Sequence, residues 1–269
     1  DAKFSPLGNY VSFIRDKDLF IIDIAAGGER RMTEGGGGAV SNGMAEFVAQ
    51  EEMGRHTGYW WSDDEKRIAF ETFDESPVPV AKRYEIYADD FKVTEQRYPA
   101  AGDPNVLVGL GVVTVSGKEA GKTVWIDLGE DKDIYLARVD WFDGGRLIVQ
   151  RQPRDQKSLD LLMADARTGG TRLIRQERSD TWVELHSDLH VLEKQPGFVW
   201  KSAGDGFPHL YICSPEGEPV TRLTGGDWCV ESLLGVDEEA GLVYFTGTKK
   251  SVLERHLYAA RLDGSCLLY

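Results

Sequence analysis

Two adjacent carboxylates, Glu51 and Glu52, are the residues of this sequence whose placement most strongly suggests chemistry. They lie near the end of SNGMAEFVAQEEMG, residues 41–54, whose apolar residues recur at helical spacing. Adjacent like charges near a helix C-terminus are unfavourable, because the helix dipole disfavours anions there. A nearby cation would offset that cost. The pair is therefore interpreted as a site for a ligand ammonium group, such as a peptide α-amino group with an unperturbed pKa of about 7.7 to 8.

A second interpretation needs no ligand. Arg55 follows Glu51 by four residues, and ion pairs at this spacing are common on helices. Spacing alone favours this alternative, so both remain open. In either case we expect a short helix over residues 42–54, capped at its start by Ser41 or Asn42 and ended by Gly54.

A long-period repeat indicates the elements that must position this helix. Segments 4–33, 146–174, 197–224 and 241–264 share one order of apolar strands and polar turns. Each contains an apolar or aromatic pair, namely Leu19-Phe20, Leu162-Met163, Leu210-Tyr211 and Leu257-Tyr258. The last three pairs recur at spacings of 48 and 47 residues. A repeat of roughly 40 to 50 residues with several short strands is typical of β-propeller blades, whereas a β-sandwich lacks a fixed long period.

Residues from about 34 to 140 break this rhythm, and we expect two blade units plus insertions there. One insertion is the helix, and the other is a projecting hairpin arm over about residues 80–99. The fold class predicted is all-β, a partial β-propeller of about five blades over residues 1–269. Turns reading SPLG, SDDE and FDGG, which begin at residues 5, 62 and 142, fit the blade entrances.

Composition excludes several classes of function. A formal net charge of −14 repels phosphate backbones, so a nucleic-acid partner is not expected. No apolar run of about 18 residues occurs, so no membrane span is expected. The three cysteines, Cys213, Cys229 and Cys266, form no CxxC motif, and one disulfide remains possible.

The sequence predicts neither a metal site nor a cofactor. His186 and His190 have the spacing of helical metal ligands, but their surroundings resemble strand and turn, so they are interpreted as surface histidines. The acidic segment 127–133 lacks the Gly and terminal Glu of a calcium loop. The glycines at 35–38 precede no Lys-Ser/Thr, so no phosphate-binding loop is indicated.

Three segments resemble a known family. AEFVAQEEMGRHTGYWW at 45–61, DESPVPV at 74–80 and RYPAAGDPNV at 97–106 are similar to the propeller domain of dipeptidyl peptidase IV-type serine peptidases of the prolyl oligopeptidase family. Bacterial dipeptidyl aminopeptidases look most similar. The resemblance is strongest over residues 44–110, and it implies a ring of eight blades.

The resemblance also implies roles for particular residues. Glu51 and Glu52 match the glutamates that hold the free amino terminus of a peptide substrate, from which N-terminal Xaa-Pro or Xaa-Ala dipeptides are released. Phe207 falls where family members line the substrate pocket, although Pro208 stands where some have Arg; packing within the blade is the alternative for Phe207. The arm at 80–99 resembles the one used in homodimers. The resemblance suggests a periplasmic or secreted location.

The catalytic part of such a peptidase is not encoded here. No G-x-S-x-G occurs, so the nucleophile elbow of an α/β-hydrolase is missing. In the family a C-terminal α/β-hydrolase domain carries the serine triad, so we expect this chain to be inactive alone and to belong to a longer hydrolase. The alternative is a propeller without enzymatic function that acts as a protein-interaction scaffold.

Overall fold

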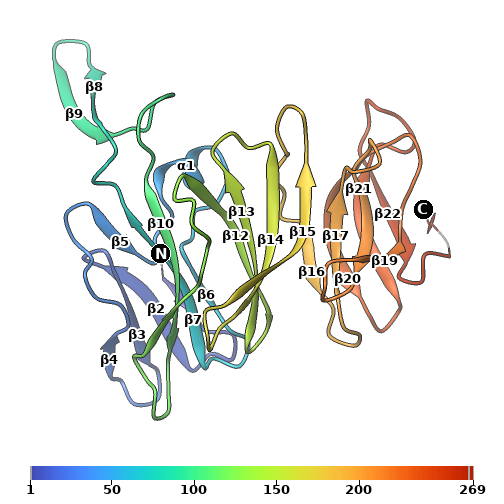
Figure 1. The fold of residues 1–269 in the computed structure, drawn as a ribbon, viewed down its shortest axis with the longest axis horizontal. Coiled ribbons are helices and arrows are strands. Elements are labelled where there is room, and N and C mark those ends of the chain that lie inside the picture. The colour runs from blue at the N-terminus through green and yellow to red at the C-terminus, as the bar shows by residue number, and fades with distance from the viewer. Residues whose placement is uncertain (1, 266, 269) are drawn as a thin grey trace. The chain divides into compact units, whose positions relative to one another are not determined.

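The computed structural model describes residues 2–265, 267 and 268, and almost all of its regular structure is β-strand. The chain divides into two compact units: unit 1 is residues 1–154 with 162–172, and unit 2 is residues 155–161 with 173–269. Five successive antiparallel sheets follow one another along the described residues (Figure 1). A two-stranded ribbon and a short helix interrupt the second sheet. The all-β prediction is confirmed.

Four of these sheets are meanders in which each strand pairs with the next. The first contains β1 (Lys3–Phe4), β2 (Tyr10–Arg15), β3 (Asp18–Asp23) and β4 (Glu29–Arg31). The third contains β12 (Ile134–Asp143), β13 (Arg146–Pro153), β14 (Ser158–Asp165) and β15 (Thr171–Arg178). The fourth contains β16 (Leu189–Val191), β17 (Phe198–Ser202), β18 (His209–Cys213) and β19 (Pro219–Arg222). The fifth contains β20 (Val230–Asp237), β21 (Leu242–Gly247), β22 (His256–Arg261) and β23 (Leu267–Leu268). Such four-stranded meanders are the blades of propellers.

The second sheet carries both insertions. Its strands are β5 (Val40–Asn42), β6 (Tyr59–Trp61), β7 (Arg67–Asp74), β10 (Leu107–Thr114) and β11 (Thr123–Trp125). The helix α1 (Phe47–Glu51) lies between β5 and β6 in sequence, and the arm, made of β8 (Val80–Ile86) and β9 (Phe91–Arg97), lies between β7 and β10.

The prediction of two blade units between residues 34 and 140 was wrong. Only the second sheet is complete in this region, because the helix and the arm account for the additional length. The strand that starts at Ile134 already belongs to the third sheet. By contrast, the turns at residues 5–8, 62–65 and 142–145 do join the first strands of successive sheets, as expected.

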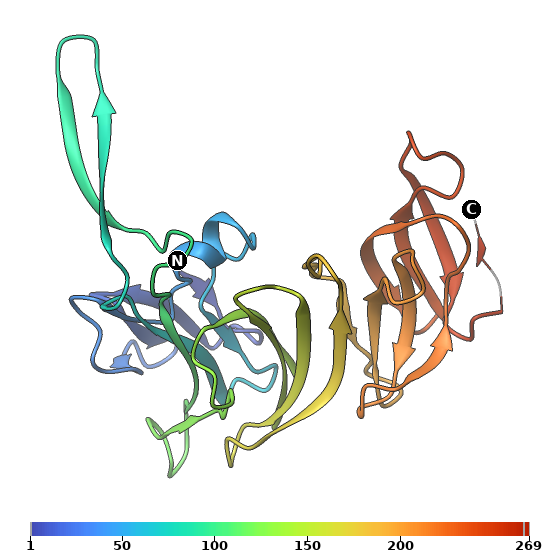
Figure 2. The same cartoon turned by 45° about the horizontal axis from the view of Figure 1, so that its top comes forward.

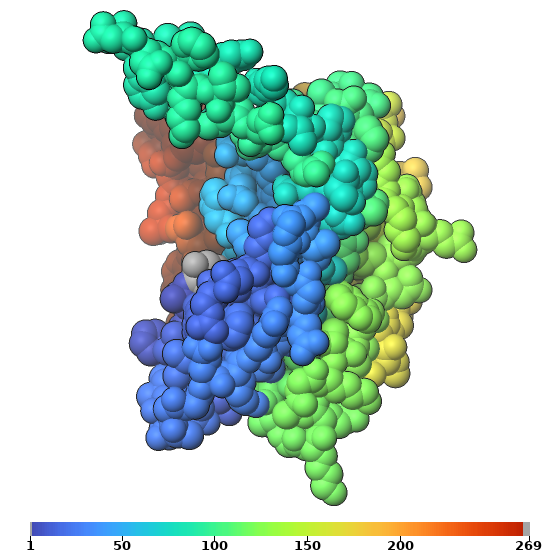
Figure 3. Space-filling model, turned by 90° about the vertical axis from the view of Figure 1, so that its left-hand side faces the viewer, coloured from blue at the N-terminus to red at the C-terminus, as the bar shows by residue number. Residues whose placement is uncertain are grey.

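The arm has one apolar face. Ile86 pairs with Phe91 and Tyr84 with Val93, so these four side chains lie on the same side of the ribbon. All four are exposed, Ile86 to 82%. The polar pairs Arg83–Thr94 and Glu85–Lys92 alternate with them. The arm stands away from the sheets of unit 1 (Figures 2 and 3), so within the described residues nothing covers its apolar face.

A threonine reinforces the same position in two regular sheets. In the first, Leu19 N donates to Thr33 Oγ1 at 2.9 Å, and this hydroxyl donates to buried Asp18 at 2.7 Å. In the fourth, Leu210 N donates to Thr224 Oγ1 at 3.0 Å. The sequence reads Arg-Met-Thr at residues 31–33 and Arg-Leu-Thr at residues 222–224. This contact explains the shared threonine, because it ties the end of the last strand back to the third strand.

Apolar side chains hold the sheets of each unit together. In unit 1, Leu19 and Ile21 of β3 pack with Ile68 and Phe70 of β7. A second cluster joins β10 to β12 and β13 through Leu110, Val112, Leu136 and Val149. In unit 2, Leu210 and Ile212 pack with Val243 and Phe245. No helix within the described residues has the length and apolar character needed to span a membrane.

Candidate functional site

The helix that carries the two glutamates is shorter than predicted and is capped differently. It covers only Phe47–Glu51, and the side chain of buried Glu46 accepts hydrogen bonds from Val48 N at 2.6 Å and Ala49 N at 2.7 Å. The predicted caps Ser41 and Asn42 belong instead to strand β5. Because the helix begins only at Phe47, Glu46 occupies the N-cap position, and its carboxylate accepts from the free amides of the first turn.

The segment after α1 is fixed by close packing and by left-handed backbone. Gly54 has a φ of 60°, as expected for the residue that ends a helix. Gly58 lies so close to Met44 that a Cβ atom there would be 2.1 Å from the Met44 carbonyl oxygen. Ala49 is fully buried and Met53 is 6% exposed. This end of the helix is therefore held firmly against unit 1.

Arg55 does not pair with Glu51, which removes the alternative interpretation of the glutamates. Its buried guanidinium donates from Nη1 to Glu71 Oε2 at 2.7 Å. Nη1 also donates to Thr57 O at 2.8 Å, and Nη2 donates to Leu136 O at 2.9 Å. The arginine is thus directed inward, into the second sheet and towards β12, and not along the helix surface.

Burial governs the charge of the carboxyl group beneath the helix. Glu71 is fully buried, and desolvation raises its pKa to about 7 despite the attraction of Arg55. Burial likewise raises the pKa of Glu46, although two backbone amides donate to its carboxylate. Arg138 donates from Nη2 to Met53 O at 2.7 Å and so fixes the residue that follows the glutamates.

Glu51 and Glu52 themselves are exposed at the end of this anchored helix. Within the described residues neither carboxylate forms a salt bridge or a hydrogen bond. The nearest arginine in sequence is engaged by Glu71. Two adjacent negative charges therefore face solvent without an internal counter-ion, an arrangement that favours binding of an external cation.

Phe207 lies in unit 2, in the turn between β17 and β18, and its side chain is 37% exposed. Its neighbour Pro208 lines a cavity of about 280 Å³ together with Trp182, His186 and Trp200. Here the interpretation of His186 as a surface histidine was wrong. Its ring contacts Trp200 with centroids 4.4 Å apart, and burial lowers its pKa to about 4.

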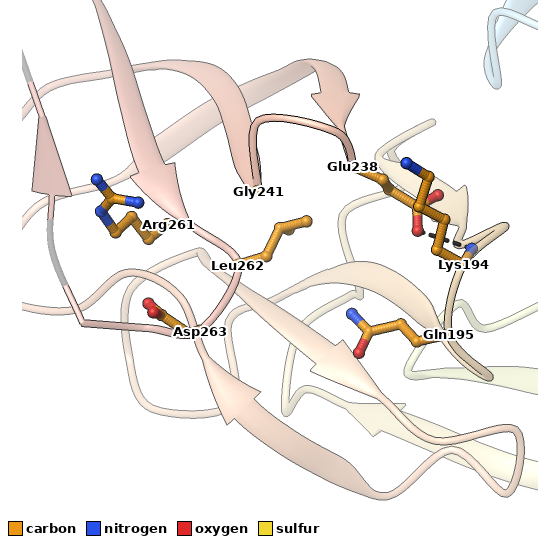
Figure 4. A pocket seen from close by; sticks show the side chains of 7 residues that line it. All are labelled: Lys194, Gln195, Glu238, Gly241, Arg261, Leu262 and Asp263. Atoms are coloured by element: carbon orange, nitrogen blue, oxygen red, sulfur yellow. Dashed lines mark hydrogen bonds between the residues drawn. The ribbon is translucent and has the colours of Figure 1, made fainter.

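A second hollow in unit 2, of about 410 Å³, lies between two turns (Figure 4). Lys194 and Gln195 line it from one turn, and Glu238 from the other. The Glu238 carboxylate accepts from Glu193 N at 2.6 Å and from Lys194 N at 2.9 Å, so it is already satisfied within the fold. This hollow contains none of the residues predicted to form a site.

The cysteines and the possible metal ligands of the described residues are dispersed. Cys213 and Cys229 are free thiols, and burial raises the pKa of Cys213 to about 11. Cys266 lies outside the described residues. Within residues 2–265, 267 and 268 no three His, Cys, Asp or Glu side chains are placed to hold a metal ion.

Comparison with known proteins gives the family. A family model described as the dipeptidyl peptidase IV N-terminal region matches residues 1–267. The chain belongs to this family. Dipeptidyl-aminopeptidase B of Aspergillus niger is 30% identical over 99% of this chain and 32% of its own length. Dipeptidyl peptidase 4 of Porphyromonas gingivalis has a similar solved structure, with a TM-score of 0.89 and 30% identity over 98% of this chain and 38% of that chain.

Membership of the dipeptidyl peptidase IV N-terminal region confirms the resemblance and identifies the successive sheets as blades of a partial β-propeller. The chain spans about a third of the length of the curated relatives it matches. The ion pair of Arg55 with Glu71 was not predicted from the sequence. Its one visible signal was an acidic residue inside the apolar strand RIAFETFD, where a buried carboxylate requires a partner.

Proposed function

We propose that this dipeptidyl peptidase IV N-terminal region binds the free amino terminus of a peptide substrate through Glu51 and Glu52. The full-length protein would be a serine exopeptidase that releases N-terminal Xaa-Pro or Xaa-Ala dipeptides, with its triad in a C-terminal α/β-hydrolase domain. One observation carries the proposal: two exposed adjacent carboxylates lack an internal cation, because Arg55 is held by Glu71. The names of the relatives support removal of N-terminal dipeptides as the reaction, since these proteins are named dipeptidyl aminopeptidases.

Physical chemistry explains how such a pair would serve an exopeptidase. Two carboxylates favour the protonated form of an α-amino group whose unperturbed pKa is about 7.7 to 8. A fixed ammonium sets the position of the chain end, so a nucleophile at a set distance meets only the bond after the second residue. Positioning of this kind lowers the activation barrier without chemistry from the glutamates themselves. Phe207 would contribute apolar contact with the bound peptide.

Kinetics of the full-length protein test this role. Glu51→Gln and Glu52→Gln keep the shape of each side chain and remove its charge. A charge-assisted hydrogen bond is worth about 1.5 to 3 kcal/mol, so kcat/KM on an Xaa-Pro anilide should fall about 10- to 100-fold for each variant. Asp63, an exposed acid in the turn after β6, supplies the control Asp63→Asn, which should leave kcat/KM unchanged. Normal kinetics in both glutamine variants would contradict the proposal.

We also propose that the full-length protein forms a homodimer through the arm. Tyr84, Ile86, Phe91 and Val93 give the ribbon an uncovered apolar face, and open ribbon edges can pair with another chain. In a two-fold dimer this patch would meet its own copy. Ile86→Lys with Phe91→Glu should yield monomers in sedimentation equilibrium, whereas substitution of the polar pair Arg83 and Thr94 by serine should not. A dimer that survives the first change would rule out this face.

The alternative is a propeller scaffold without enzymatic function. The glutamate pair favours the peptidase, because it lies at the end of an anchored helix and has no cation of the fold as its partner. A full-length protein that lacks a G-x-S-x-G segment and does not cleave Xaa-Pro anilides would favour the scaffold.

A further inference from the structure

The contacts beneath α1 assign a role to a residue that does not itself face the substrate. We propose that Arg55 is a positioning residue that holds Glu51 and Glu52 in the orientation needed to bind a peptide ammonium group. This inference rests on the proposed function of the two glutamates. It concerns how the fold fixes them, and Arg55 would touch neither substrate nor reacting atoms.

Arg55 joins the end of the helix to three other segments. Its backbone N donates to Ala49 O at 2.9 Å and so closes the last turn of α1. Its side chain reaches Thr57 O in the following segment, Glu71 of β7 and Leu136 O of β12. Three bonds from one buried, planar guanidinium leave the helix end little freedom to rotate. Glu51 and Glu52 lie only four and three residues earlier in the chain.

The buried ion pair of Arg55 with Glu71 contributes less to stability than an apolar pair could, which favours a positioning role for Arg55. Buried ion pairs contribute little net stability, because desolvation opposes their attraction. Within the described residues Arg55 Nε and Glu71 Oε1 are buried without a hydrogen-bond partner. An apolar pair could fill this space without two unsatisfied polar atoms. What an apolar pair could not do is donate hydrogen bonds to the carbonyl groups of Thr57 and Leu136.

The inward orientation of the Arg55 side chain has a second consequence for the candidate site. On the helix surface the same guanidinium could neutralise Glu51, at a spacing of four residues. Glu71 instead retains it inside unit 1. The buried carboxylate therefore both anchors the helix and keeps the surface pair free for a ligand cation.

The test uses two variants of the full-length protein. Arg55→Lys keeps the charge but loses the planar fork, so it cannot reach all three acceptors. Arg55→Met combined with Glu71→Met removes both partners, so no buried charge is left alone and the fold should persist. The matched control is Arg15→Met, which removes an arginine from the exposed pair with Glu29. Binding is measured for an Xaa-Pro peptide inhibitor and for its deaminated analogue, which lacks the ammonium group.

The result expected is specific to the ammonium group. Both Arg55 variants should bind the free-amine inhibitor about 10- to 100-fold more weakly, because small displacements of positioning groups have effects of this size. The deaminated analogue should bind as it does to the wild type, and Arg15→Met should change neither ligand. Hydrogen exchange at Gln50 N and Glu52 N, which form the turn of α1, should accelerate in both Arg55 variants.

Three results would overturn the inference. Unchanged binding of the free-amine inhibitor in both Arg55 variants would do so. Equal weakening of both ligands would do so as well, because it would indicate general disruption. Glu51→Gln and Glu52→Gln are measured in parallel: if they leave the free-amine inhibitor unaffected, the proposed function fails together with this inference. If they weaken it and the Arg55 variants do not, only the inference fails.

Discussion

The first and second sheets bury charge in different ways. In the first, buried Asp18 accepts hydrogen bonds from Thr33, Arg31, Asn42 and Gly36 N, so its carboxylate is fully surrounded by donors. In the second, buried Glu71 has Arg55 as its partner and one oxygen without any. The first sheet is a plain meander, and the second carries the helix and the arm.

This difference distinguishes the sheet that carries the candidate site from a regular sheet. In the first sheet every donor to Asp18 comes from the fold itself, so this carboxylate has no role left for a ligand. In the second sheet the buried arginine serves an insertion, and the insertion presents two carboxylates without partners. Deviation from the repeat therefore marks the candidate site more clearly than any cavity does.

The largest expected effect is a loss of stability on removing a threonine hydroxyl, and it compares the fourth sheet with the first. Thr224→Val should destabilise unit 2 by about 1 to 3 kcal/mol, because Leu210 N and His209 Nδ1 both lose the Thr224 hydroxyl while buried. Thr33→Val likewise removes the hydroxyl that accepts from Leu19 N, but it should cost less, because the second partner of that hydroxyl, Asp18, keeps its other donors. Urea unfolding of the two variants measures the difference. Equal losses of unfolding free energy would show that the hydrogen-bond networks around the two threonines do not distinguish these sheets.

The next effect concerns the second sheet and its dependence on pH. The pKa of Glu71 is raised by burial from 4.5 to about 7, with Arg55 and Glu46 as the charged groups that act on it. The folded state holds this proton more tightly than the unfolded state, so the contribution favours folding below pH 4.5 and is lost as pH rises to about 7. Glu71→Gln should remove this slope. A variant whose stability still falls over pH 4.5 to 7 as in the wild type would exclude Glu71 as its source.

Acid should reduce the local stability of the fourth sheet at a higher pH than that of the first sheet. Burial lowers the pKa of His209, near Arg222 and Asp205, so the stability it confers is present above pH 6.5 and declines as pH falls. For Asp18, burial is outweighed by hydrogen bonds from Thr33, Arg31 and Asn42, which hold its pKa below 3.8. Its contribution is lost only below about that pH. Hydrogen exchange at pH 5 should therefore accelerate more at Leu210 N than at Leu19 N, after correction for intrinsic rates.

The smallest expected effect is at the surface. Arg15 and Glu29 form an exposed pair at 2.5 Å on the first sheet. Because solvent screens such pairs, Arg15→Met should unfold at the same urea concentration as the wild type. A clear loss of stability would mean that packing of Arg15 on the Phe20 ring contributes more than its charge does. The Arg15 Cζ atom lies 4.2 Å from the centroid of that ring.

The sequence predicted those features that depend on local pattern. Period and turn residues identified the blades, and an interruption of the repeat at residues 80–99 identified the arm. Adjacent glutamates at the end of a helical pattern indicated the candidate site, which stays a prediction. It could not predict that Glu46 caps the helix or that Arg55 turns inward to Glu71, because those choices depend on which strands lie beneath α1. Local spacing instead favoured a pair of Arg55 with Glu51, which the fold does not form.

The central claim is that Glu51 and Glu52 recognise an ammonium group, and one binding cycle tests it most directly. Affinities of an Xaa-Pro peptide inhibitor and its deaminated analogue are measured for the full-length wild type and for Glu51→Gln combined with Glu52→Gln. The wild type should prefer the free amine by about 100-fold or more, and the double variant should lose most of this preference while its affinity for the deaminated analogue stays the same. A wild type that binds both ligands equally, or a double variant that keeps its preference, would contradict the account.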